Sequence, residues 1–308
     1  MTAATSGSSD APGMYMYEHL IIGLQGTAVS SEERRRLREK PPLGVILFER
    51  NIEAPEQVKR LLADVRECTG KHTWAAIDEE GGRVSRIPWP PFNSRKNASG
   101  YGVEYALSPE AASRAVYDDS HRIGLVLSDL GFTHNCAPVL DVFHAQGHRI
   151  IGERAYSADI NVVTELGTAC IRGLHDAGIE AVAKHFPGHG RANADSHVAV
   201  PEVDAPMDTL LAEAQPFARL GGQGLGHIMT AHVVYKQVEQ QVATLSPFWL
   251  KDVLRTRFGF DGCIWSDDLC MKGAGNDICT AARQALDAGC DALLVCQPGG
   301  ISQIYDMV

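Results

Sequence analysis

Short apolar runs alternate with longer amphipathic segments along nearly all of the 308 residues. The apolar runs, which we interpret as buried strands, cover residues 19–24, 44–48, 73–78, 133–141, 180–185, 227–233, 263–267 and 292–296. The segments with helical spacing between them cover residues 31–40, 55–68, 109–130, 160–177, 207–220, 247–258 and 277–288. Apolar strands separated by helices are typical of a parallel sheet covered by helices. Eight such strands predict an α/β protein with a single (β/α)8 barrel of the TIM type.

Polar and reactive side chains stand at the ends of several of these runs. They are Asp78, Asp141, Lys184, His185, His232 and Asp267. In a barrel the carboxyl ends of the strands meet at one face, where the active sites of this fold lie. The alternative is a doubly wound open sheet, which needs a Gly-rich turn after an early strand. The only Gly-rich candidate, residues 221–226, precedes a strand, so the pattern favours the barrel.

No linker divides the chain, which predicts one catalytic barrel domain at residues 14–308. Residues 1–13 are small and polar and are expected to form a flexible segment ahead of it. After the last apolar run, residues 297–308 are enough for a helix of only one to two turns. We therefore expect a short or incomplete last helix on that side of the barrel.

Composition limits the partners and the compartment of the protein. A formal charge of -10 and the lack of a long basic tract argue against nucleic acid. The amino terminus lacks the features of a secretory signal, and no apolar run approaches the roughly 20 residues of a membrane span. We expect a cytoplasmic monomer that binds no membrane. The eight cysteines form no CxxC pair and are expected to be free thiols.

Residues 184–190 are rich in histidine, and Asp195 and His197 follow shortly after them. Pro187 and the adjacent glycines prevent a regular helix, so the segment must be a shaped loop. A metal site is one interpretation, with ligands from His185, His189, Asp195 and His197. The other is an acid/base pair in which Asp195 orients His197, while His185 binds ligand and His189 shapes the loop. The interrupted spacing and the absence of an HExxH motif favour the pair.

Asp267 and Asp268 follow the seventh apolar run. A buried acid at a strand end is costly unless it is paired or used, so one of them is a candidate nucleophile, base or metal ligand. The other reading is a cap for the following segment. We assign the chemistry to Asp267 and the scaffolding role to Asp268.

Asp78 ends the third run and leads into a Gly-Gly turn. Its carboxylate can accept hydrogen bonds from ligand hydroxyl groups, and Arg83 or Arg86 can donate back. The three consecutive acids at residues 78–80 could instead form a surface turn.

Together these motifs resemble the β-N-acetylhexosaminidases of glycoside hydrolase family three, which act in bacterial peptidoglycan recycling. The resemblance rests on residues 78–83, 137–142, 151–154, 184–190, 195–197, 229–232, 244–254 and 266–269, in family order. It implies that Asp267 is the nucleophile and that His197, with Asp195 as its partner, is the general acid and base. The sugar-binding positions that it implies are Asp78, Arg86, Arg154, Lys184 and His185.

The implied reaction is retaining hydrolysis that releases terminal N-acetylglucosamine from muropeptide fragments through a covalent glycosyl-aspartate, with no metal and no cofactor. A neutral histidine repels an anionic acceptor less than a carboxylate does, so a glycosyl phosphorylase is an alternative. A metal-dependent TIM-barrel hydrolase and a barrel that only binds sugar are further alternatives. The loop that carries His197 is predicted to swing between open and closed states.

Overall fold

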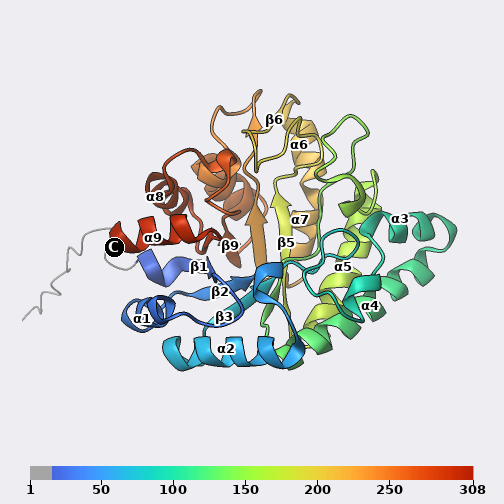
Figure 1. The fold of residues 1–308 in the computed structure, drawn as a ribbon. Helices are drawn as coiled ribbons and strands as arrows, with labels where there is room; N and C mark the ends of the chain where they lie inside the picture. Colours follow the sequence, from blue (N-terminus) through green and yellow to red (C-terminus); the bar gives the residue numbers. More distant parts are fainter. Residues whose placement is uncertain (1–15, 308) are drawn as a thin grey trace, which may run out of the picture.

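The computed structural model describes residues 16–307, and a barrel of parallel strands lies at its centre (Figure 1). All eight strands that the apolar runs predict are present. They are β1 (Leu20–Gly23), β2 (Gly44–Leu47), β3 (Trp74–Ile77), β4 (His134–Asn135), β5 (Glu180–Phe186), β7 (His227–Thr230), β9 (Cys263–Trp265) and β10 (Leu293–Val295).

The strands are paired in parallel in the order β10-β1-β2-β3-β4-β5-β7-β9. Since β10 pairs with β1, the last strand returns beside the first. Between β9 and β10 the ladder is irregular. A parallel bridge joins Trp265 to Ala292, and the N–H of Ser266 donates to the carbonyl of Ala292 at 2.8 Å. The sheet is a nearly closed (β/α)8 barrel, which confirms the predicted fold class.

The helices lie outside the strands (Figure 1). In α2 (Pro55–Thr69) the proline occupies the first turn, where a missing N–H costs nothing, and Val58, Leu61, Leu62 and Val65 form one buried face. Its residues therefore form a helix that covers the strands with that face. The other predicted helices are α1 (Ser31–Glu39), α4 (Pro109–Leu130), α5 (Ile160–Asp176), the π-helix η6 (Phe248–Arg257) and α8 (Ile278–Ala288).

Two parts of the helical layer differ from the prediction. The helix expected at residues 207–220 is divided into α6 (Met207–Glu213) and α7 (Gln215–Gly221), because Pro216 cannot donate an N–H to the preceding turn. Helix α3 (Ala98–Leu107) was not predicted, since Gly100 and Gly102 weaken the helical signal. Packing requires Gly102, because a Cβ there would lie 1.8 Å from the carbonyl oxygen of Tyr156.

Side chains fill the interior of the barrel. The inner cluster comprises Ile21, Ile46, Ala76, Cys136, Val182, Met229, Trp265, Ala292, Leu294 and Cys296. At the amino ends of the strands Trp74 stacks on Trp265 with ring centroids 5.6 Å apart, and His134 and His227 pack against this pair. These rings fill that end of the barrel, whereas charged side chains such as Lys184 and Asp267 lie at the opposite, carboxyl ends of the strands.

The last helix, α9 (Pro298–Met307), has 10 residues and packs against α8 and β1. At 3.6 residues per turn it is longer than the predicted one to two turns. A small second sheet that was not predicted pairs β6 (Glu202–Val203) with β8 (Val234–Tyr235). The flexible segment predicted at residues 1–13 lies outside the described residues.

All eight cysteines are free thiols, as predicted, and four of them are buried. Among residues 16–307, no helix combines the length and the apolar character that crossing a membrane requires.

Candidate active site

A cavity of about 440 Å³ opens at the carboxyl ends of the strands. Its volume lies within the range of small-molecule sites, and many of its lining groups are polar. Every site residue that the sequence predicts lines this cavity except Asp195, which stands behind His197. The predicted residues in the lining are Asp78, Arg86, Arg154, Lys184, His185, His197 and Asp267.

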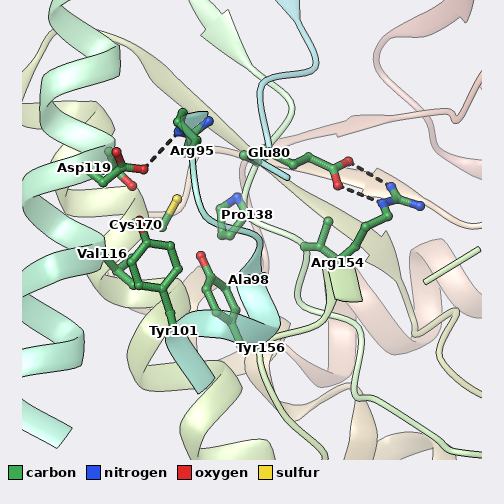
Figure 2. A pocket seen from close by; sticks show the side chains of 14 residues that line it. Glu80, Arg95, Ala98, Tyr101, Val116, Asp119, Pro138, Arg154, Tyr156 and Cys170 are labelled. Atoms are coloured by element: carbon green, nitrogen blue, oxygen red, sulfur yellow. Dashed lines mark hydrogen bonds and ion pairs between the residues drawn. The ribbon is translucent and has the colours of Figure 1, made fainter. Parts of the chain in front are cut away.

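Four charged side chains, Asp78, Glu80, Arg154 and Lys184, form what we call the charged wall. Lys184 Nζ donates to Asp78 Oδ1 at 2.7 Å and lies 2.8 Å from Glu80 Oε1. Arg154 binds both carboxylate oxygens of Glu80, at 2.7 and 2.8 Å (Figure 2). Burial opposes each charge, but the opposite charges prevail, so the pKa of Glu80 lies far below its usual value and the pKa of Lys184 above it. The wall therefore stays ionised.

Glu79, which lies between Asp78 and Glu80 in the sequence, fixes the backbone of the charged wall through hydrogen bonds. Its fully buried carboxylate accepts the backbone N–H of Arg86 at 2.5 Å, and its carbonyl accepts a hydrogen bond from Arg95 at 3.0 Å. Arg95 in turn donates to Asp119 on α4 at 2.9 Å (Figure 2). The strand-end turn is thus anchored to a helix, and this anchoring holds the Arg86 guanidinium 3.3 Å from Asp78.

Asp141 fixes two histidines of the predicted loop. Its buried carboxylate lies 2.7 Å from Nδ1 of His185 and accepts the backbone N–H of His189 at 2.6 Å. Because Nδ1 of His185 faces a carboxylate, this ring presents Nε2 to the cavity. The ring of His189 also lines the cavity, and burial lowers its pKa to about 4, so it is neutral near pH 7.

The two acids after β9 have different surroundings. Asp268 Oδ1 accepts the backbone N–H groups of Cys270 and Cys296, both at 3.0 Å, and so ties β9 to β10. Asp267 Oδ1 accepts the N–H of Asp268 at 2.8 Å, and no other hydrogen bond to this carboxylate occurs in the described part of the chain. Burial would raise the pKa of Asp267, but electrostatic attraction from the side chains around it, His232 first among them, and the N–H of Asp268 hold it below its usual value. Asp267 is therefore an ionised carboxylate with a free oxygen at the cavity.

Residues 194–200, which we call the histidine loop, reach the cavity from the other side. His197 Nδ1 lies 2.7 Å from Asp195 Oδ1, which also accepts the backbone N–H of His197 at 2.9 Å. Partial burial would raise the pKa of Asp195, but these hydrogen bonds hold it below its usual value. The His197 side chain is 59% exposed. The predicted pair is thus in contact, and Nε2 of His197 is left to meet a ligand.

The residues considered for a metal site do not come together as one. Over residues 16–307 no three His, Cys, Asp or Glu side chains are arranged to bind a metal ion. His185 and His197 are instead each held by a separate carboxylate, Asp141 and Asp195. Nδ1 of His189 is buried without a hydrogen-bond partner.

Glu80 is a member of the charged wall that we did not single out from the sequence. The available signal was its place two residues after Asp78 in an acidic strand-end motif. Its partner Lys184 lies in β5 and its partner Arg154 lies in the connection between β4 and α5, so their pairing becomes visible only in the fold.

Comparison with known proteins extends the resemblance over the whole barrel. The chain is 37% identical over 290 residues to a β-hexosaminidase of Bordetella pertussis, covering 93% of this chain and 82% of that protein. It is 38% identical over 291 residues to a β-hexosaminidase of Idiomarina loihiensis, covering 93% and 86%.

A solved structure of NagZ from Neisseria gonorrhoeae in complex with N-trifluoroacetyl-D-glucosamine is also similar, with a TM-score of 0.87 and 34% identity. The match covers 94% of this chain and 84% of that one. The family model for the glycosyl hydrolase family 3 N-terminal domain matches residues 16–308. The protein is therefore a glycoside hydrolase, and its chain belongs to glycosyl hydrolase family 3.

Proposed function

We propose that this chain is a retaining β-N-acetylglucosaminidase that releases terminal N-acetylglucosamine from muropeptide fragments. The observation that carries the proposal is an ionised, buried Asp267 in the cavity that the Asp195–His197 pair also reaches. A retaining glycosidase needs a nucleophile on one side of the glycosidic bond and an acid/base on the other. The relatives named β-hexosaminidase and the relative bound to an N-acylated glucosamine support the choice of sugar.

In the first step, Asp267 attacks the anomeric carbon and forms an ester bond with it. The bond between this carbon and the leaving oxygen breaks, and His197 Nε2 gives its proton to that oxygen. Asp195 accepts the Nδ1 proton of His197 and so stabilises the imidazolium form of the ring, whose Nε2 proton is the one transferred; the ring is left neutral. The charge on Asp267 also stabilises the positive sugar ring of the transition state.

In the second step, His197 Nε2 takes a proton from water, and the water oxygen attacks the anomeric carbon. The bond to Asp267 breaks, and the carboxylate is restored. Because each step inverts the anomeric centre, the product retains the β configuration.

The charged wall is proposed to hold the hydroxyl groups of the sugar. Asp78 can accept hydrogen bonds, while Lys184, Arg86, Arg154 and the Nε2 atom of His185 face the same cavity. Since the ion pairs fix these atoms in advance, binding requires little reorganisation of the wall.

The covalent step is tested with a slow fluorinated N-acetylglucosaminide followed by mass spectrometry of the digested protein. We expect the sugar on the peptide that contains Asp267. A labelled peptide from another part of the chain would overturn the assignment of the nucleophile.

The substrate is tested by comparing nitrophenyl N-acetylglucosaminide with the corresponding glucoside. We expect hydrolysis of the first and a much lower kcat/KM for the second. The same assay in phosphate buffer should produce free sugar, whereas sugar 1-phosphate would identify a phosphorylase. Activity should also survive a chelator, and its loss would favour a metal-dependent hydrolase.

The free state of all eight cysteines supports a reducing compartment, and we propose that the enzyme works in the cytoplasm. Fractionation of cells that produce the natural protein tests this location.

A further inference from the structure

The histidine loop is joined to the rest of the fold at a narrow base. Asn193 and Glu202 close this base, because the N–H of Glu202 donates to Asn193 Oδ1 at 2.9 Å and the N–H of Asn193 donates to the carbonyl of Glu202 at 3.2 Å. Beyond it, Ser196 makes the only hydrogen bonds that link residues 194–200 to another element within the described chain.

Ser196 rests on the turn that follows the nucleophile strand. Its carbonyl accepts the N–H of Gly273 at 3.0 Å, and its hydroxyl lies 3.6 Å from the sulfur of Met271. Although its neighbour His197 is exposed, Ser196 itself is only 4% exposed. The loop therefore has one buried anchor beside one exposed functional side chain.

Gly273 leaves the space that this anchor needs. A Cβ at Gly273 would lie 2.8 Å from the Cβ of His232 and 3.3 Å from the Cβ of Ser196. His232 cannot easily retreat, because it is fully buried and its ring contacts Thr244 at 2.9 Å and the carbonyl of Asp268 at 3.1 Å. Any side chain at position 273 must therefore displace the loop or its support.

The same turn leads directly to the nucleophile. The N–H of Met271 donates to the carbonyl of Asp268 at 2.9 Å, and Asp268 is the neighbour of Asp267. One short segment, residues 267–273, thus carries the nucleophile at its start and supports the histidine loop at its end.

We propose that Ser196 and Gly273 are positioning residues whose contact sets the place of His197 relative to Asp267. This inference rests on the proposed function, in which His197 is the acid/base. The contact touches neither the sugar nor the reacting atoms. It acts by holding the loop where Nε2 of His197 can reach the leaving oxygen.

The test compares Gly273→Ala with Gly299→Ala, whose added methyl would meet no atom within 4 Å. The readout is kcat/KM for a dinitrophenyl and for a methyl N-acetylglucosaminide, since this ratio reports the step that needs the acid. Misplacing an acid/base should reduce the methyl glycoside rate by about 10- to 100-fold. The dinitrophenyl rate should change by less than about threefold, because this leaving group needs little protonation. Gly299→Ala should behave like the wild type on both substrates.

Ser196→Val tests the contact from the loop side. Ala199→Val is its control, because it places the same valine side chain at an exposed position of the same loop. We expect Ser196→Val to show the same selective loss as Gly273→Ala. Azide, which attacks the covalent intermediate without a base, should raise kcat of both variants on the dinitrophenyl substrate, for which breakdown of the intermediate limits turnover.

Three outcomes would overturn the inference: no selective loss in either variant, a selective loss in only one of them, or equal losses on both substrates. His197→Ala, measured in parallel, separates this result from the proposed function. If His197→Ala itself lacks the selective loss, the acid/base assignment fails. If it shows the loss while Gly273→Ala and Ser196→Val do not, only the positioning contact fails.

Discussion

The charged wall and the histidine loop border the same cavity but are held in place by opposite means. In the wall, Lys184 is 3% exposed and touches two carboxylates that come from another strand end. In the loop, His197 is 59% exposed and touches a carboxylate only two positions away. One region depends on long-range pairing, and the other is assembled locally.

In the proposed mechanism, this difference separates sugar binding from proton transfer. The wall cannot move without leaving buried charges unpaired, which costs several kcal/mol. We expect the loop to move as a unit, because Asp195 and His197 both belong to it and, in the described structure, only Ser196 links it to another element by hydrogen bonds. We therefore expect changes in the wall to affect stability and binding, and changes in the loop to affect turnover alone.

The largest effect is expected at Asp267, which lines the cavity that both regions border. Asp267→Asn should reduce kcat by more than about 10⁴-fold, because an amide cannot form the covalent intermediate. Asp268→Asn is the matched control, since its carbonyl oxygen can still accept the N–H groups of Cys270 and Cys296. We expect it to keep kcat within about tenfold of the wild type. The reverse ranking, measured by steady-state kinetics, would exchange the assigned roles.

The loop is tested by His197→Ala and Asp195→Ala. Loss of the acid/base should lower kcat/KM for a poor leaving group by about 10² to 10⁴-fold, with a smaller loss when only its partner is removed. Because the His197 side chain is largely exposed, the midpoint of thermal unfolding should shift by less than about 2 °C. A large shift would show that the pair supports the fold.

The wall is tested by Lys184→Met, which leaves Asp78 and Glu80 without their shared cation. Removal of one partner from a buried ion pair should lower the free energy of unfolding by about 3 kcal/mol or more. Lys59→Met is the control, because its ion pair with Asp129 is exposed and should contribute less than about 1 kcal/mol. Denaturant titration measures the free energy of unfolding of both variants. Equal losses would contradict the expectation that the buried ion pairs of the wall stabilise the fold more than an exposed pair does.

The last effect develops gradually with pH and concerns two buried histidines, His134 and His189. Burial lowers the pKa of His134 to about 3 and that of His189 to about 4, whereas an unfolded histidine titrates near 6.5. Below pH 6.5 the unfolded chain therefore binds protons that the folded chain excludes. The free energy of unfolding should fall as the pH drops from about 6.5 to 4, by up to about 1.4 kcal/mol per unit for each histidine.

His134→Phe should make this pH dependence shallower by removing one buried imidazole. His72→Ala, which removes an exposed histidine ring, is the control and should leave the slope unchanged. The check is a series of denaturant titrations between pH 4 and 7. An unchanged slope in His134→Phe would contradict the expectation.

Much of the fold was predictable because strand and helix periodicity are local properties of the chain. All eight barrel strands follow from the apolar runs. Helix α3 was missed because Gly102, which weakens the helical signal, is required by contact with Tyr156. The predicted fourth strand is also shorter than expected, since Pro138 has no N–H to continue the ladder.

The site was only partly predictable. Asp78, Lys184, His185 and Asp267 were visible as reactive groups at strand ends, and the short spacing of Asp195 and His197 suggested their pairing. The sequence could not show that Lys184 joins Asp78 to Glu80. It also left open which of the two acids after β9 ties the strands together.

By itself the sequence determined the barrel, the strand ends that carry chemistry and the Asp195–His197 pair, because each depends on residues that are close along the chain. Only the tertiary structure decided the ionisation of the charged wall, the free oxygen of Asp267 and the anchoring of Ser196 on Gly273. These depend on burial and on partners from distant strands. Burial sets the cost of each charge, and closure of the barrel supplies the partners that offset it.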